Sequence, residues 1–199
     1  MLEKEEKKFK NKFRINSARH PIWDYADDGI YFITICTQDK INYFGDVVNE
    51  EMDLNGVGDV VNKFWLEIPK HFNNVILDEY IVMPNHVHGI IFIDNNDIST
   101  ERERRDVALQ RLYDYHGKNR QMSKISPQQK SLSTIIRSYK SICTKIINQK
   151  YFTINFAWQS RFYDRIIRNE HELNNVRNYI YNNPYKWTIN RNNIENLFM

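Results

Sequence analysis

Three segments of the chain have the continuous apolar, β-branched and aromatic composition of buried strands. Residues 30–37 (IYFITICT) form a run that is too short for a typical helix, and they predict a central strand. Residues 75–83 and 86–94 form two further runs, separated by the turn-forming pair Pro84-Asn85. The pattern therefore predicts an antiparallel strand pair that follows the first strand.

Apolar residues recur with helical spacing in three other segments. These are residues 57–72, 132–147 and 170–182. Turn residues between 39 and 56 predict a short hairpin or irregular excursion, and the aromatic segment 156–167 predicts a fourth or edge strand. The resulting order β-α-β-β-α-β-α indicates an α+β fold, namely a ferredoxin-like antiparallel sheet with helices packed on one face.

The ends of the predicted helices carry recognisable signals. Pro69 lies near the end of the first helix and makes its last turn uncertain. Ser131 or Ser133 could be the N-cap of the second helix. Asn183-Pro184 is expected to end the third helix.

The length of 199 residues corresponds to one domain with additions. We expect a basic, flexible N-terminus over residues 1–14, a folded domain over 15–190 and a C-terminal tail over 191–199. The polar, charged segment at about 95–129 lacks ordered apolar spacing. It predicts a mobile insertion within the domain.

Composition excludes several classes of protein. No uninterrupted apolar run approaches the roughly 18 residues of a membrane span, and the N-terminus has no apolar signal-peptide core. Cys36 and Cys143 are widely spaced within apolar segments, which is typical of reduced, buried thiols. These features predict a cytoplasmic protein without a membrane partner.

Positive charge is segregated along the chain, although the net charge is only +3. No Asp or Glu occurs between Tyr115 and Tyr163, where nine Lys and Arg residues lie, and the first twenty residues carry seven Lys or Arg against three Glu. Such a distribution favours a polyanionic partner, most simply nucleic acid. An ordinary solvated basic face is the alternative that charge alone would leave open.

Two histidines flank a valine at the start of the run 86–94. Side chains at positions i and i+2 of a strand point to the same face, so His86 and His88 can direct two neutral imidazoles at one metal ion. A buried strand would normally carry apolar residues at both positions, and two polar rings there need a partner that satisfies them.

A tyrosine and an amide share one face of the last predicted helix. Tyr179 and Asn183 are four residues apart, whereas Tyr181 lies about 200° round the helix from Tyr179. Tyr179 borders the apolar stripe of this helix, where its hydroxyl could reach the histidines. Two histidines, a tyrosine and an amide are the groups that a metal-assisted tyrosine nuclease requires.

Seven motifs together resemble a known family over about residues 14 to 187. They are WDY at 23–25, GIYFITICTQ at 29–38, MPNHVHGIIF at 83–92, IRSYKS at 136–141, WQ at 158–159, RFYDRIIRNE at 161–170 and YIYNNP at 179–184. In order and spacing the chain resembles the REP-associated, single-tyrosine HUH transposases, named for their histidine–hydrophobic–histidine motif. It departs from them in the 94–129 insertion, and at Arg165, where the family pattern has a histidine.

The resemblance implies an HUH endonuclease fold and a site that binds Mg²⁺ or Mn²⁺. It implies that His86 and His88 are metal ligands, that Asn183 is the third ligand and that Tyr179 is the nucleophile. The expected activity is cleavage and rejoining of single-stranded DNA near hairpins through a 5′-phosphotyrosine intermediate. The enzyme could act as a monomer or a homodimer.

Basic residues on the predicted surface are expected to contact the DNA. The predicted contacts are Arg14, Arg19, Arg137, Lys140, Lys145 and Arg161. On the helix 132–147 these cations lie opposite the isoleucines, which is also the arrangement of any solvated helix face.

Alternatives remain open for single residues and for the function. Tyr181 is the rival nucleophile, Asn183 could merely cap the helix, and Glu170 or Asp164 could replace it as a ligand. A domesticated protein that binds hairpin DNA without cleaving it is the main rival function. A phosphodiesterase with two histidines as acid and base is less suitable, because the chain offers a single close pair. The sequence leaves open which hairpin is recognised, whether the chain still mobilises DNA, and what the insertion does.

Overall fold

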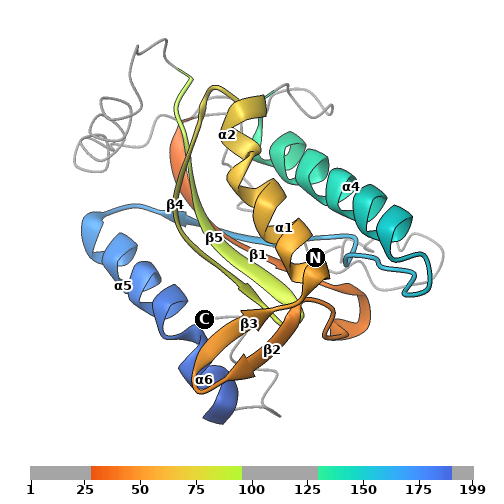
Figure 1. The fold of residues 1–199 in the computed structure, drawn as a ribbon. Helices are drawn as coiled ribbons and strands as arrows, with labels where there is room; N and C mark the ends of the chain where they lie inside the picture. Colours follow the sequence, from red (N-terminus) through yellow and green to blue (C-terminus); the bar gives the residue numbers. More distant parts are fainter. Residues whose placement is uncertain (1–27, 96–129, 190–199) are drawn as a thin grey trace, which may run out of the picture.

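A four-stranded antiparallel sheet is the centre of the fold (Figure 1). The computed structural model describes residues 28–95 and 130–189. Within them the sheet has the order β4-β5-β1-β6, built from β1 (Gly29–Cys36), β4 (Val75–Met83), β5 (His86–Ile93) and β6 (Tyr163–Ile167). The predicted strand pair 75–83 and 86–94 is confirmed as β4 and β5, and the central strand as β1.

Helices follow the strands in the predicted order. They are α1 (Gly56–Leu66), α2 (Ile68–His71), α4 (Leu132–Lys150), α5 (Glu170–Tyr181) and α6 (Asn183–Ile189). The β-α-β-β-α-β order of the ferredoxin-like fold is therefore present, with α5 and α6 added after the last strand.

The excursion after β1 contains a short 3-10 turn and a two-stranded hairpin. The turn is η2 (Gln38–Lys40), and the hairpin pairs β2 (Gly45–Val48) with β3 (Glu51–Leu54). The sequence prediction of a hairpin in this segment is confirmed. The aromatic segment before β6 contributes only an isolated bridge between Thr37 and Trp158, so its strand is shorter than the predicted 156–167.

Side-chain caps define where the helices begin. Asn55 accepts hydrogen bonds from two backbone N–H groups of α1, and Ser131, one of the two predicted candidates, caps α4. The predicted helix 57–72 is divided in two, because Pro69 lies in the first turn of a new short helix, α2. Asn183-Pro184 ends α5 as predicted, but it also begins α6.

Both faces of the sheet are covered. Odd-numbered residues of β1 and β5 pack with α1 and α4 in one apolar cluster, whereas even-numbered residues pack with Leu173, Val176 and Ile180 of α5. The α+β class and antiparallel sheet are confirmed, but the expectation of helices on one face is corrected by α5, which lies across the sheet from α1 and α4 (Figure 1). All eight residues of β5 are buried, so both of its faces require a covering layer.

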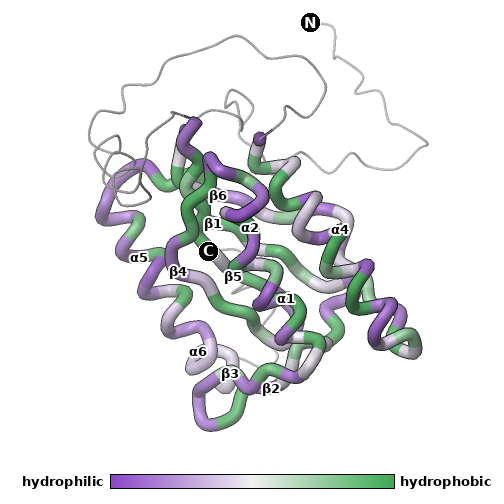
Figure 2. The backbone as a smooth tube through the Cα atoms, turned by 45° about the horizontal axis from the view of Figure 1, so that its top comes forward, coloured by the Kyte–Doolittle hydropathy of each residue, from purple (hydrophilic) through white to green (hydrophobic). Residues whose placement is uncertain are grey.

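Hydropathy follows this layered arrangement. The central strands are largely hydrophobic, and the helices around them carry both hydrophobic and hydrophilic residues along their length (Figure 2). Within residues 28–95 and 130–189, no helix is long and apolar enough to cross a membrane.

Several predicted features lie outside the described residues. These are the basic N-terminus at 1–14, the WDY motif, the segment 96–129 of the insertion, the tail at 191–199 and the predicted DNA contacts Arg14 and Arg19.

Candidate active site

The two histidines lie side by side on the face of β5 that α5 covers. His86 is 1% exposed and His88 is fully buried, and their ring centroids are 4.5 Å apart. Strand alternation places them on one face, as the sequence predicted. The neighbouring strand β1 pairs Cys36 with His86 and Thr34 with His88, so the histidines occupy the interior of the sheet rather than its edge.

A hydrogen bond at Nδ1 fixes the orientation of each imidazole. Asn85 Oδ1 lies 2.8 Å from His86 Nδ1, and the Asn85 amide nitrogen donates to the carbonyl of Lys40, so the oxygen is the atom that faces the ring. Thr34 Oγ1 lies 2.8 Å from His88 Nδ1. With protons on both Nδ1 atoms, the Nε2 lone pairs are free to act as acceptors or ligands.

Burial keeps both imidazoles neutral. It lowers the pKa of His86 to about 3, a shift that the Asn183 side chain partly opposes, and it lowers the pKa of His88 well below its usual value, with further lowering from His86. His86 Nε2 is buried and forms no hydrogen bond of ordinary geometry with the described residues. A neutral, buried and unsatisfied nitrogen is the state that a metal ligand requires.

Tyr179 is the tyrosine that the fold brings to the histidines. Its hydroxyl lies 3.3 Å from His88 Nε2, and its ring packs against the rings of His88 and Phe32, with centroids 5.2 and 5.9 Å away. Burial raises the pKa of Tyr179, while Asn183 acts in the opposite direction. Tyr181 is 81% exposed and lies away from this cluster.

Asn183 is the amide that completes the cluster. As the first residue of α6 it is 7% exposed, and its side chain influences the pKa values of both His86 and Tyr179. The alternative ligands are not placed with the histidines. Glu170 is exposed at the start of α5, and Asp164 pairs with Ile33 on the opposite face of the sheet.

The donor set of the cluster suits a divalent cation held by nitrogen and amide oxygen. Among the described residues, no three His, Cys, Asp or Glu side chains gather as a metal site. The Asn183 amide lies beside His86 and can add an oxygen donor to the two imidazoles. Two nitrogens and one oxygen leave room in the coordination sphere for substrate oxygens or water.

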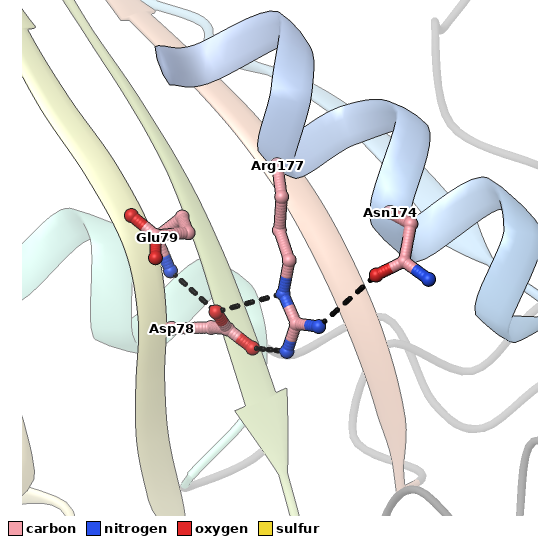
Figure 3. A network of polar contacts seen from close by, with 4 residues as sticks. All are labelled: Asp78, Glu79, Asn174 and Arg177. Carbon is pink, nitrogen blue, oxygen red and sulfur yellow. Dashed lines mark hydrogen bonds and ion pairs between the residues drawn. The ribbon is translucent and has the colours of Figure 1, made fainter.

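Helix α5 is attached to the sheet next to the tyrosine. Arg177 donates from Nε and Nη2 to the two carboxylate oxygens of Asp78 on β4, at 3.1 and 2.5 Å, and from Nη1 to Asn174 at 3.3 Å (Figure 3). The backbone N–H of Glu79 also donates to Asp78. Register shifts between Leu77 and Tyr80, so Asp78 lies at a bulge in β4.

The predicted DNA-contacting residues on α4 and in the segment before β6 differ in their exposure to solvent. Arg137, Lys145 and Arg161 are exposed, whereas Lys140 is half-buried and its ammonium donates to the carbonyls of Gln159 and Ser160. Helix α4 covers the face of the sheet opposite the histidines. Arg137, Lys140 and Lys145, which belong to α4, therefore lie on a different side of the sheet from Tyr179.

Four residues of the cluster were not singled out from the sequence. Thr34 and Asn85 orient the histidines, Trp187 packs near His86 with ring centroids 5.8 Å apart, and Lys186 lies over the Tyr179 ring. Asn85 directly precedes His86, which is a local signal. Finding Thr34 requires the register between β1 and β5.

Known proteins similar to this chain include two from Haemophilus influenzae. One, described only as an uncharacterized protein, is 34% identical over 86% of this chain and 88% of its own length. The other bears the name of a REP-associated tyrosine transposase and is 25% identical over 82% of this chain and 74% of its own length. No protein-family model matches the chain.

Two solved structures show a weaker similarity. A REP-associated tyrosine transposase bound to a REP hairpin has a TM-score of 0.47 and 17% identity, over 79% of this chain and 67% of that one. A transposase structure from Deinococcus radiodurans has a TM-score of 0.40 and 14% identity, over 78% of this chain and 91% of that one.

The two sequence relatives differ in what they show. The first covers most of both chains but has no assigned function, and the second is more distant. Over most of its length the chain is similar to a protein that bears the name of a REP-associated tyrosine transposase.

Proposed function

We propose that this protein is a metal-dependent single-strand DNA endonuclease and transposase that cleaves and rejoins DNA near hairpins through a 5′-phosphotyrosine intermediate. One observation carries the proposal: Tyr179 and Asn183, distant in sequence from the histidines, join the buried pair His86 and His88 in a single cluster. Similarity to a protein named as a REP-associated tyrosine transposase supports the transposase part of the proposal.

The residues that would hold the metal are His86 and His88, through Nε2, and Asn183, through its amide oxygen. Mg²⁺ prefers oxygen ligands and Mn²⁺ accepts nitrogen more readily, so both are candidates. When bound, such a cation polarises the scissile phosphate and offsets the negative charge of the transition state. Asn85 and Thr34 hold the Nδ1 side of each imidazole and so direct both Nε2 atoms toward the site.

Tyr179 carries out the bond exchange. Its hydroxyl oxygen forms a bond to phosphorus as the bond between phosphorus and the 3′ oxygen breaks; the phenol proton passes to solvent, and the departing oxygen takes up a proton to become a free 3′-OH. The phosphotyrosine retains the phosphodiester energy, so a later attack by a 3′-OH rejoins strands by the reverse exchange. A single nucleophilic tyrosine makes one cleavage at a time, and strand transfer therefore needs two copies or sequential use of one.

The Tyr179 hydroxyl is in contact with His88 before substrate binds. Its oxygen lies 3.3 Å from His88 Nε2. With the His88 proton on Nδ1, the hydroxyl donates to the Nε2 lone pair, which cannot serve both the tyrosine and a metal. Loading the site therefore requires the hydroxyl to leave His88, which frees the oxygen for the phosphate.

The proposed substrate is single-stranded DNA beside a hairpin. A partly buried tyrosine needs an extended strand that can approach it, and one related protein is named for REP sequences. Exposed cations, including Arg137, Lys145 and Arg161, are proposed to bind the phosphates of the hairpin or its flanks.

An adduct assay tests the proposal. The protein is incubated with a pool of labelled hairpin oligonucleotides carrying single-stranded flanks, with Mg²⁺ or Mn²⁺, and analysed on denaturing gels with and without EDTA. We expect a metal-dependent covalent adduct that is absent in Tyr179→Phe and retained in the matched control Tyr181→Phe. Tight hairpin binding without an adduct would instead favour the DNA-binding protein that lacks cleavage, and loss of the adduct in Tyr181→Phe alone would reassign the nucleophile.

A further inference from the structure

We propose that Lys186 is a catalytic residue that binds a non-bridging oxygen of the scissile phosphate beside Tyr179. The inference rests on the proposed function and deepens it, because it assigns the substrate contact that the metal ligands and the nucleophile leave open. Lys186 belongs to α6, the same short helix that begins with Asn183.

The position of the ammonium group carries the inference. Lys186 Nζ lies 5.1 Å from the centroid of the Tyr179 ring, on a side chain that is otherwise exposed. No carboxylate of the described residues pairs with it. A cation over the ring of the proposed nucleophile, exposed and without a carboxylate partner in residues 28–95 and 130–189, is available to a phosphate.

The backbone of α6 fixes where this lysine can reach. Asn183 and Pro184 are buried at the start of the helix, and the Trp187 ring packs near His86. The backbone N–H of Lys186 donates to the carbonyl of Asn182, which places the lysine one turn after the end of α5. Contacts on both sides of Lys186 therefore hold it at the edge of the histidine cluster.

The chemistry required of Lys186 is binding alone. Its ammonium offers three donors on a flexible four-carbon stem, so it can follow the phosphate from the extended strand to the phosphotyrosine. The ammonium donates N–H···O hydrogen bonds to an oxygen that carries negative charge before, during and after the exchange. No proton or leaving group passes through it.

The chain offers a matched control. Lys150 Nζ also lies 5.1 Å from the centroid of a tyrosine ring, that of Tyr151, but Tyr151 packs against the apolar cluster on the opposite face of the sheet. Lys150→Ala removes the same kind of contact without touching the proposed site. A general effect of losing a lysine–tyrosine contact would appear in both variants.

The first experiment measures single-turnover adduct formation on the hairpin oligonucleotide that the wild-type protein cleaves best. We expect Lys186→Ala to slow the reaction by roughly 10²-fold, Lys186→Arg to restore most of the rate and Lys150→Ala to match the wild type. Thermal unfolding identifies any variant that fails to fold. A wild-type rate in folded Lys186→Ala would overturn the role of Lys186 while leaving the proposed function intact, and absence of any adduct in the wild type would overturn both.

The second experiment asks whether the scissile phosphate is the partner. In the non-cleaving Tyr179→Phe background, Lys186→Ala should weaken binding of the oligonucleotide by about tenfold. A methylphosphonate at the scissile position replaces a charged oxygen with a methyl group, so with this substrate the added substitution should change affinity little. An equal loss of affinity with both substrates would show that Lys186 does not contact this phosphate.

Discussion

Arg177 on α5 and Asp78 on β4 form a two-point ion pair across 99 positions of sequence, two residues before Tyr179 (Figure 3). The Asp78 side chain is only 9% exposed. The pair connects the helix that carries the tyrosine to the sheet that carries the histidines. Its geometry therefore bears on both stability and the placement of Tyr179.

Arg177→Met should destabilise the protein by about 2 kcal/mol, because it leaves a largely buried carboxylate without its guanidinium partner. Urea denaturation measures this loss. Arg165→Met is the control, since the Arg165–Glu172 pair spans 3.0 Å but its arginine is 57% exposed, and its loss should cost less than about 1 kcal/mol. Equal losses in the two variants would contradict the importance of the Asp78 pair.

Thr34→Val should weaken metal binding by roughly 10- to 100-fold, because it removes the hydrogen-bond partner of His88 Nδ1 while preserving the shape of the side chain. Titration with Mn²⁺, followed by the paramagnetic resonance of the free ion, measures the affinity. Thr34→Ser keeps the hydroxyl and should bind as the wild type does. Unchanged affinity in Thr34→Val would show that this hydrogen bond does not support the site.

The metal-free protein should lose stability as the pH falls below about 6.5. The unfolded His86 imidazole binds a proton near its ordinary pKa of 6.5, whereas burial lowers the folded pKa to about 3. Between these values the unfolded state binds more protons, so His86 alone should cost about 2 kcal/mol between pH 7.5 and pH 5, and His88 acts in the same direction. Urea denaturation in EDTA at the two pH values tests this.

The exposed His71 supplies the control for that measurement. His71→Gln should retain the pH dependence of the wild type, because the pH-dependent loss arises from the buried histidines. A stability that stays constant from pH 7.5 to pH 5 would contradict the burial of neutral imidazoles in the metal-free state.

Gly89→Ala should destabilise the fold by about 2–3 kcal/mol through overpacking. A Cβ at Gly89 would lie 2.2 Å from Cζ2 of Trp65, a ring that is itself fully buried. Gly29→Ala is the milder comparison, since its Cβ would come no closer than 3.0 Å to the Tyr31 side chain, at the hydroxyl. A smaller loss in Gly89→Ala than in Gly29→Ala, measured by thermal unfolding, would show that Trp65 can move aside.

Local sequence patterns were sufficient to predict most of the helices and strands. The β-branched run of β1, the turn Pro84-Asn85 and the apolar spacing of α4 each depend on interactions within a few residues, and the structure contains all three. The division at Pro69 into α1 and α2 shows the limit of this approach. Spacing identifies an apolar face, but it does not show that the chain begins a new helix on the same face.

The sequence pattern did not predict which face of the sheet α5 covers. An all-apolar strand such as β5 shows that both of its faces are buried, but it does not show which helix covers each face. The register shift between Leu77 and Tyr80 also changes which face later residues of β4 occupy, so that Ile81 joins Ile76 on the α5 side. The expected single helical layer was wrong because no local pattern assigns α5 to the face opposite α1 and α4.

The sequence by itself determined the composition of the candidate site. His86 and His88 share a strand face, which follows from the strand period. The four-residue spacing of Tyr179 and Asn183 selected both residues, although α5 ends at Tyr181 and Asn183 begins α6. Only the tertiary structure decided that these two pairs meet, that Tyr181 stays in solvent, and that Thr34, Asn85 and Lys186 surround them. The physical reason is that strand register and the packing of α5 and α6 depend on contacts between residues far apart in the chain, which no local period encodes.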